Sequence, residues 1–186
     1  MEVLSVDKQF PNVITVSIKE RREIYYIEYD QKYYVTTEDG FVLNAFDKSA
    51  FSGNIARDKI LLKLNGVDIV NVELGSFIKT DNDDLMRAVF EMAKSAKLTD
   101  CIKDISILKV GGYDNVYDVT FKAYTGVEIC IEDVLELGTE KVIIAFDVYD
   151  NVLSDYQKTF GKIETYVMND GEFRVTYNQQ LIDMNR

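Results

Sequence analysis

Several residue types that usually carry catalysis or metal binding are scarce in this chain. It has no histidine and only two cysteines among its 186 residues. Without histidine the chain lacks the usual general base and the usual metal ligand, and Cys101 and Cys130 do not have the spacing of a zinc site. We therefore expect no metal and no cofactor. Each cysteine is interpreted as a small buried hydrophobe, and a disulfide between them stays open as the alternative.

Long apolar runs and basic residues are also in short supply. No apolar run approaches the roughly 18 residues that span a bilayer, and residues 1–11 lack the pattern of a signal peptide, so we expect the chain to be soluble. Lysine and arginine number 21 against 32 aspartates and glutamates, which gives a formal net charge of -11. Because this negative field opposes phosphate backbones and anionic lipids, we expect no binding to nucleic acid.

What the chain does contain is typical of one folded domain. Hydrophobic residues make up 47% of the sequence and charged residues 28%, and the length suits a single main core. Alternation in residues 12–20, "NVITVSIKE", predicts a half-buried strand with Ile14, Val16 and Ile18 on one side. Three further strands are predicted at residues 23–29, 32–37 and 41–46.

Turn signals separate these strands and continue beyond them. Asp30-Gln31 and Asp39-Gly40 are predicted turns, and the second is interpreted as a two-residue hairpin turn in which glycine accepts a positive φ. Residues 49–57 are predicted to be a connecting loop. Asn65-Gly66 predicts a further turn between two short apolar segments.

The clearest helix pattern begins in the acidic run "TDNDD". Thr80 and Asp81 are expected to cap the helix, and Asp83 and Asp84 complement its positive end. The apolar residues that follow recur every three or four positions: Leu85, Val89, Met92 and Ala96. A calcium loop would need an oxygen ligand and a glycine where Leu85 and Met86 stand, so capping is the better interpretation of the acidic run.

The second half of the chain predicts three strands, a helix and two closing strands. The three strands lie in "DISILKV", "NVYDVTFKAY" and "VEICIED". In residues 139–157 the strand propensity competes with a helical spacing, and the spacing decides for a helix capped by Thr139. Its apolar face is predicted to hold Val142, Phe146, Tyr149, Leu153 and Tyr156. The closing strands, residues 163–168 and 172–177, flank a turn at 169–171.

Motifs of catalysis are weak. The pair Asp147 and Asp150 could act as acid and base, but acids three residues apart on a polar helix face are usually solvated charge. The chain has no glycine-rich phosphate loop and no nucleophile elbow. Taken alone, the residues indicate an acidic α+β domain that binds rather than catalyses.

The order of the motifs resembles the bacterial cell-division proteins of the FtsQ/DivIB family. The similar elements are Phe10-Pro11, an alternating strand that ends at Glu20-Arg21, and the Asp39-Gly40 hairpin with Val42-Leu43. They are followed by "NGVDI", a helix, three strands, "ELGTEKV" leading into a second helix, and two closing strands. The resemblance covers nearly the whole chain.

The resemblance implies an α+β fold in which two main helices pack on an antiparallel/mixed β-sheet. Residues 1–21 would be the C-terminal remnant strand of a POTRA domain, residues 22–178 the β domain, and residues 179–186 a frayed tail. The cytoplasmic tail, a transmembrane helix and most of the POTRA domain would precede Met1, so that this domain lies on the extracytoplasmic side of a single-pass membrane protein.

The function that the resemblance implies is a non-enzymatic divisome scaffold. It would bind DivIC/FtsB-like and FtsL-like proteins and help to recruit or regulate septal peptidoglycan synthesis, with this part of the chain monomeric. Because a terminal strand leaves unpaired backbone groups, we expect the closing hairpin to be the partner site. The candidate contacts are Tyr166, Met168, Gly171, Phe173, Val175 and Tyr177. The alternative is an extracellular wall- or glycan-binding module that stacks sugars on its tyrosines.

Overall fold

The structure is a computed structural model of the chain, and it describes residues 2–51, 61–96, 101–168 and 172–179. Most of the predicted loop at residues 49–57, the turn at 169–171 and the tail from residue 180 lie outside these ranges. The N-terminal half contains β1 (Glu2–Gln9), β2 (Val13–Lys19), β3 (Tyr25–Tyr29), β4 (Lys32–Thr36), β5 (Val42–Asp47), β6 (Leu62–Asn65), β7 (Ile69–Asn71), β8 (Lys79–Thr80) and α2 (Asp83–Ser95). The C-terminal half contains β9 (Ile102–Lys109), β10 (Tyr117–Ala123), β11 (Glu128–Ile131), α3 (Gly138–Asp147), β12 (Lys162–Val167) and β13 (Phe173–Asn178).

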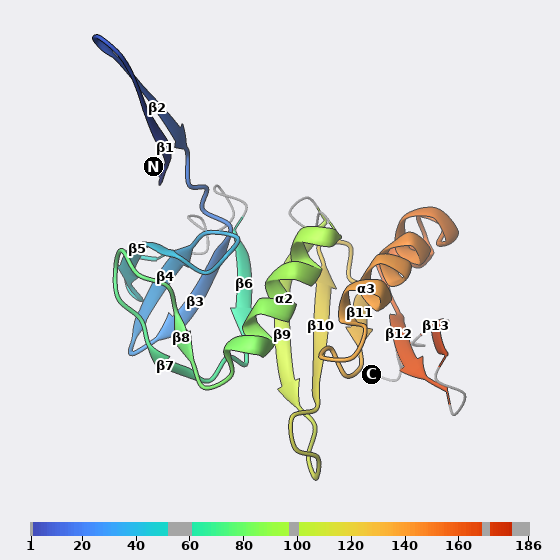
Figure 1. The fold of residues 1–186 in the computed structure, drawn as a ribbon. Helices are drawn as coiled ribbons and strands as arrows, with labels where there is room; N and C mark the ends of the chain where they lie inside the picture. Colours follow the sequence, from blue (N-terminus) through green and yellow to red (C-terminus); the bar gives the residue numbers. More distant parts are fainter. Residues whose placement is uncertain (1, 52–60, 97–100, 169–171, 180–186) are drawn as a thin grey trace.

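A nine-stranded mixed sheet forms the body of the protein, in the order β13-β12-β11-β10-β9-β6-β3-β4-β5. Strand β6 runs parallel to both β3 and β9, and β11 runs parallel to β12. The other neighbours are antiparallel. Helices α2 and α3 lie side by side on one face of this sheet (Figure 1). The predicted α+β architecture with two main helices on a mixed sheet is confirmed.

The main core lies between the helices and the sheet. Alternation in β10 buries Tyr117, Val119, Phe121 and Ala123, as the sequence predicted. Phe121 meets Phe146 of α3 edge to face, with ring centroids 5.8 Å apart. A smaller apolar cluster lies on the opposite face of the β3-β4-β5 end of the sheet, and its buried members are Val35, Phe51 and Leu61.

The N-cap of helix α2 lies one residue after the predicted caps, Thr80 and Asp81. Its N-cap is Asn82, whose Oδ1 accepts from the Leu85 backbone N–H at 3.0 Å. Thr80 and Asp81 do not cap the helix, because the side chain of Thr80 instead donates to Asp83 Oδ1 at 3.1 Å. Asp83 and Asp84 occupy the first turn, where the helix dipole favours negative charge.

Helix α3 differs from the prediction at both ends. Its N-cap is Leu137, with φ at 53° and no side-chain cap, so Thr139 lies inside the helix rather than at its cap. After Asp147 the chain continues as a π-helical turn, Val148–Val152. The predicted apolar face is buried as far as Leu153, whereas Tyr156 lies beyond the helix and is 71% exposed.

The two turns of the β3-β4-β5 meander have different geometries. Asp30 and Gln31 both have positive φ, at 46° and 62°, as a tight two-residue hairpin requires. The Asp39-Gly40 turn is not a two-residue hairpin, because Thr37 N–H donates to the Phe41 carbonyl at 2.9 Å and leaves three residues in the loop. Gly40 alone takes the positive φ there, at 81°.

Residues 2–19 form a separate two-stranded ribbon that stands away from the body (Figure 1). The predicted strand at residues 12–20 is present as β2, but it is not half-buried: Ile14, Val16 and Ile18 are 65%, 50% and 55% exposed, respectively. Its partner β1 was not predicted, so the expected single remnant strand is a hairpin. One face of the ribbon is apolar, with Val6 opposite Val16.

No helix within the described residues is long and apolar enough to cross a membrane.

Candidate functional site

The closing hairpin, β12 and β13, lies at one end of the nine-stranded sheet (Figure 1). Strand β13 pairs with β12 on one side and is the terminal strand of the sheet. The sequence predicted both strands and their place at the end of the sheet. Whether this hairpin binds a partner stays a prediction.

The predicted contact residues divide between the two faces of the hairpin. Tyr166 lies opposite Arg174, and alternation places both on the face that α2 and α3 do not cover. Phe173, Val175 and Tyr177 are half-buried on the other face, and Val175 and Tyr177 pack against the main core. Met168 follows β12 and is half-buried. Gly171 lies outside the described residues.

The register of the hairpin determines which backbone groups point outward. Met168 N–H donates to the Glu172 carbonyl at 2.6 Å, which makes this a hydrogen-bonded pair of the antiparallel ladder. Because such pairs alternate, Arg174, Thr176 and Asn178 direct their backbone groups toward β12. The intervening residues, Phe173, Val175 and Tyr177, direct their backbone N–H and C=O groups away from β12. We call these outward groups the free edge of β13.

Paired charges lie on the uncovered face beside the free edge. Lys162 Nζ donates to Glu164 Oε1 at 2.5 Å, and Asn178 Nδ2 donates to Glu164 Oε2 at 2.7 Å. The hydrogen bond from Lys162 lowers the pKa of Glu164, and the same bond raises the pKa of Lys162. The charges of Lys162 and Glu164 thus compensate each other within the sheet, whereas Arg174 is exposed on the same face.

Cys101 and Cys130 form no disulfide and are both half-buried, so the disulfide alternative is not realised and the expected full burial is only partly met. Cys130 lies on the same uncovered face, with its Sγ 3.3 Å from the Thr120 hydroxyl. Burial raises the pKa of the Cys130 thiol, which keeps it protonated and poorly nucleophilic.

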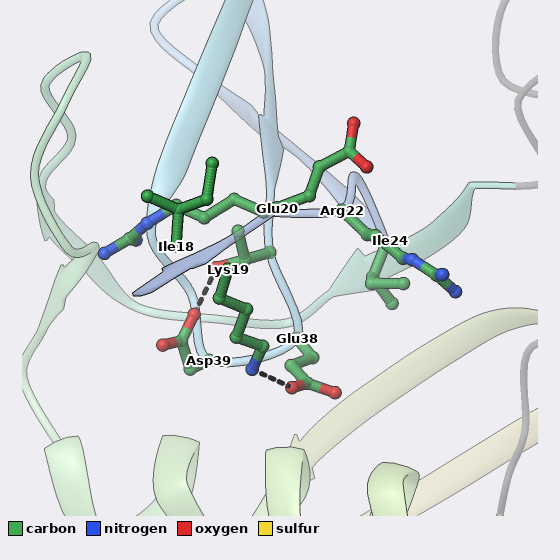
Figure 2. A pocket seen from close by; sticks show the side chains of 9 residues that line it. Ile18, Lys19, Glu20, Arg22, Ile24, Glu38 and Asp39 are labelled. Atoms are coloured by element: carbon green, nitrogen blue, oxygen red, sulfur yellow. Dashed lines mark hydrogen bonds and ion pairs between the residues drawn. The ribbon is translucent and has the colours of Figure 1, made fainter. Parts of the chain in front are cut away.

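A second candidate is a cavity of about 580 Å³ where the ribbon joins the body (Figure 2). It is lined by residues 18–22, Ile24 and residues 37–39. Lys19 Nζ lies 3.5 Å from Glu38 Oε1, and Asp39 accepts a hydrogen bond from the Thr37 hydroxyl. One ion pair, between Lys19 and Glu38, therefore spans the cavity, which fits a junction between two parts of the chain better than a site for one ligand.

The acid pair Asp147 and Asp150 is exposed at the end of α3. Asp147 Oδ1 accepts from the Asn151 side chain at 2.7 Å, as a solvated helix end would allow. The tyrosines needed by a glycan-binding module are dispersed: Tyr113, Tyr124 and Tyr156 are half or more exposed but come from three separate connections.

Sequence reasoning missed the internal role of Tyr177. Its single hydroxyl hydrogen can be donated to the backbone carbonyl of Gln157, at 3.1 Å, or to that of Phe160, at 3.0 Å. Gly161 makes room for this ring, since an added Cβ would lie 2.8 Å from the Tyr177 hydroxyl. A glycine directly before a strand was the one available signal, and it did not reveal which side chain it faced.

The chain was compared with known families, curated proteins and solved structures. No model of a known family matches the chain. The chain is 27% identical over 143 residues to "Cell division protein DivIB" of Clostridium tetani, which covers 77% of this chain and 49% of that protein. It therefore spans about half the length of this curated relative. Among solved structures, it is similar to the major extracytoplasmic domain of the trans isomer of DivIB from Geobacillus stearothermophilus. That match has 16% identity and a TM-score of 0.37, and it covers 70% of this chain and 93% of the other.

Proposed function

We propose that this chain belongs to the FtsQ/DivIB family of bacterial cell-division proteins and is the extracytoplasmic binding part of a membrane-anchored divisome protein. Its activity is to bind other proteins, without catalysis and without a cofactor. The likeness to a cell-division protein over three quarters of the chain supports the division role. The role in septal peptidoglycan synthesis is the recruitment or regulation of the enzymes that perform it.

The free edge of β13 is the observation that carries the binding proposal. Three residues, Phe173, Val175 and Tyr177, direct both an N–H and a C=O away from β12. An extended partner segment can add to this edge as a further strand, because its own backbone supplies the complementary groups. Main-chain hydrogen bonds would give affinity, and the alternating side chains would give specificity.

The faces of β13 define the partner segment that fits. Residues of an added strand that lie opposite Phe173, Val175 and Tyr177 share the helix-covered face, so apolar side chains fit there. On the other face the exposed Arg174 favours an acidic or polar neighbour. We assign this strand to the extracytoplasmic segments of DivIC/FtsB-like and FtsL-like division proteins.

We also propose that residues 1–21 end a POTRA domain and that residues 22–178 form the β domain, followed by a short tail. The ribbon supports this division. A two-stranded hairpin is at best marginal in water, and the apolar side chains of Ile14, Val16 and Ile18 are at least half exposed. They require a covering layer, which the helices of a POTRA domain upstream would provide.

Substitution of one edge residue tests the binding proposal. We expect Val175→Pro to weaken binding of the DivIC extracytoplasmic segment about ten-fold, because proline removes one outward N–H and its ring obstructs the added strand. The bonds between β13 and β12 are retained, since Val175 does not donate to β12. Affinity is measured by isothermal titration calorimetry at a temperature where circular dichroism shows the variant to be folded.

Two controls make the test decisive. Val175→Ala loses the side chain but keeps the N–H, and we expect its affinity to stay within about three-fold of the wild type. Thr176→Pro removes an N–H that points toward β12, and we expect it to lower the melting temperature instead. Equal affinities for folded Val175→Pro and Val175→Ala would contradict strand addition at this edge.

A further inference from the structure

Three segments that are distant in sequence meet at the C-terminal end of β13. They are the turn between β10 and β11, a 3₁₀-helical turn at Gln157–Thr159 with the residues that follow it, and β13 itself. Gly126, with φ at 119°, lies so close to the 3₁₀ turn that an added Cβ would be 2.6 Å from the Thr159 carbonyl oxygen. The two backbones can approach this closely only because this position has no side chain.

The second close approach joins the same segment to β13. Gly161 has φ at 98°, and an added Cβ would lie 2.8 Å from the Tyr177 ring and 2.9 Å from the Asn178 carbonyl oxygen. The Gly161 carbonyl also accepts from the Glu128 N–H at 3.1 Å, which ties this segment to the start of β11. The end of β13 therefore rests against a connection that is itself fixed to β11, two strands in from the edge.

The hydroxyl of Tyr177 holds this corner together. It lies within hydrogen-bond distance of the Gln157 and Phe160 carbonyl oxygens, at 3.1 Å and 3.0 Å, and so satisfies acceptors at the end of the 3₁₀ turn. Its ring is half-buried and packs against the main core. Its side chain is thus turned toward the protein, although its backbone groups belong to the free edge.

We propose that Tyr177 is a positioning residue for the free edge of β13 and not a direct side-chain contact of the partner. This inference rests on the proposed function, and it names the residue that prepares the same site. A terminal strand has ladder bonds on one side only, so its end frays unless another contact holds it. The Tyr177 hydroxyl supplies that contact, so the outward groups of Val175 and Tyr177 are ordered before the partner arrives. An ordered edge loses less entropy on binding.

Removal of the hydroxyl alone gives the first test. We expect Tyr177→Phe to raise amide hydrogen exchange in residues 172–179 several-fold without a partner present. We expect the affinity for the DivIC extracytoplasmic segment to fall about five-fold, the factor that corresponds to one net hydrogen bond. Tyr113→Phe is the matched control, because Tyr113 is 65% exposed on the connection between β9 and β10. We expect it to change neither quantity.

A pair of glycine variants gives the second test and separates the effect of backbone strain from that of the contact with Tyr177. Gly161→Ala and Gly112→Ala both place a side chain at a positive φ, 98° and 86° respectively. Only the first meets Tyr177, since nothing lies within 4 Å of the Cβ added at Gly112. We expect both variants to melt at lower temperature, and only Gly161→Ala to raise exchange in residues 172–179 and to weaken binding.

The outcomes separate this inference from the proposed function. If Tyr177→Phe lowers the melting temperature but leaves both local exchange and affinity unchanged, Tyr177 has only a structural role and the inference is wrong. If the wild-type chain does not bind the DivIC segment, the proposed partner is wrong, and the exchange data still decide whether Tyr177 orders the edge. Weaker binding by Tyr177→Phe with unchanged exchange would make Tyr177 a direct contact and overturn the positioning role.

Discussion

At the scale of single residues, Lys141 shows how a buried charge can organise a loop. Its side chain is fully buried, and its Nζ donates to the backbone carbonyls of Glu132 at 2.8 Å and Asp133 at 3.1 Å. These carbonyls belong to the connection from β11 to α3, in which Asp133 and Leu137 both have positive φ. Desolvation lowers the pKa of Lys141, while the neighbouring acids oppose that shift.

We expect Lys141→Met to lower the free energy of unfolding by about 2–4 kcal/mol, because the carbonyls of Glu132 and Asp133 lose a charged donor while the apolar stem is kept. Urea denaturation followed by circular dichroism measures this change. Lys79→Met is the control, since Lys79 is exposed and its replacement should stay within about 0.5 kcal/mol. Similar losses in the two variants would show that the carbonyl contacts contribute little.

At the scale of elements, the periodicity of the sequence predicted which side chains of a strand are buried where alternation alone decides it. It did not predict burial or contacts that depend on a neighbouring element. The burial of Tyr117, Val119 and Phe121 follows from alternation within β10 alone, so the sequence was sufficient there. The exposure of β2 could not be predicted, because its apolar face looks the same whether or not another layer covers it. The free edge of β13 was predicted from strand order, whereas the contact of Tyr177 with Gln157 and Phe160 depends on tertiary packing.

The N-terminus of α2 allows the distinction between competing caps to be measured. We expect Asn82→Ala to cost about 1 kcal/mol, because the Leu85 N–H loses its side-chain acceptor. For a chain of this size such a loss lowers the melting temperature by about 2–4 °C. Asp81→Ala removes the neighbouring acid that sequence alone assigned to the cap, and its melting temperature should change less. Melting temperatures are measured by differential scanning calorimetry. A larger decrease for Asp81→Ala than for Asn82→Ala would show that Asp81 is the N-cap.

At the scale of the whole molecule, the ribbon and the body are joined by residues 20–24, which belong to neither sheet. Two side-chain contacts are made at this junction. Lys19 and Glu38 form an ion pair between side chains that are about half exposed, and such pairs contribute little and are weakened by salt. The Arg21 guanidinium lies 3.6 Å from the centre of the Phe41 ring, which in turn meets Phe77 edge to face.

We expect the contact of Arg21 with Phe41, and not the ion pair, to set the orientation of the ribbon. Spin labels at Thr15→Cys in β2 and Glu91→Cys in α2, with Cys101 and Cys130 replaced by serine, report the distance between the ribbon and the body by pulsed electron resonance. Arg21→Ala should broaden the distance distribution at any salt concentration, because the stacking is lost. Lys19→Ala should leave the distribution close to that of the parent, since the ion pair is screened by solvent. Equal broadening by both variants would contradict this expectation, because the ion pair would then contribute as much as the ring contact, and the parent distribution should broaden on addition of salt.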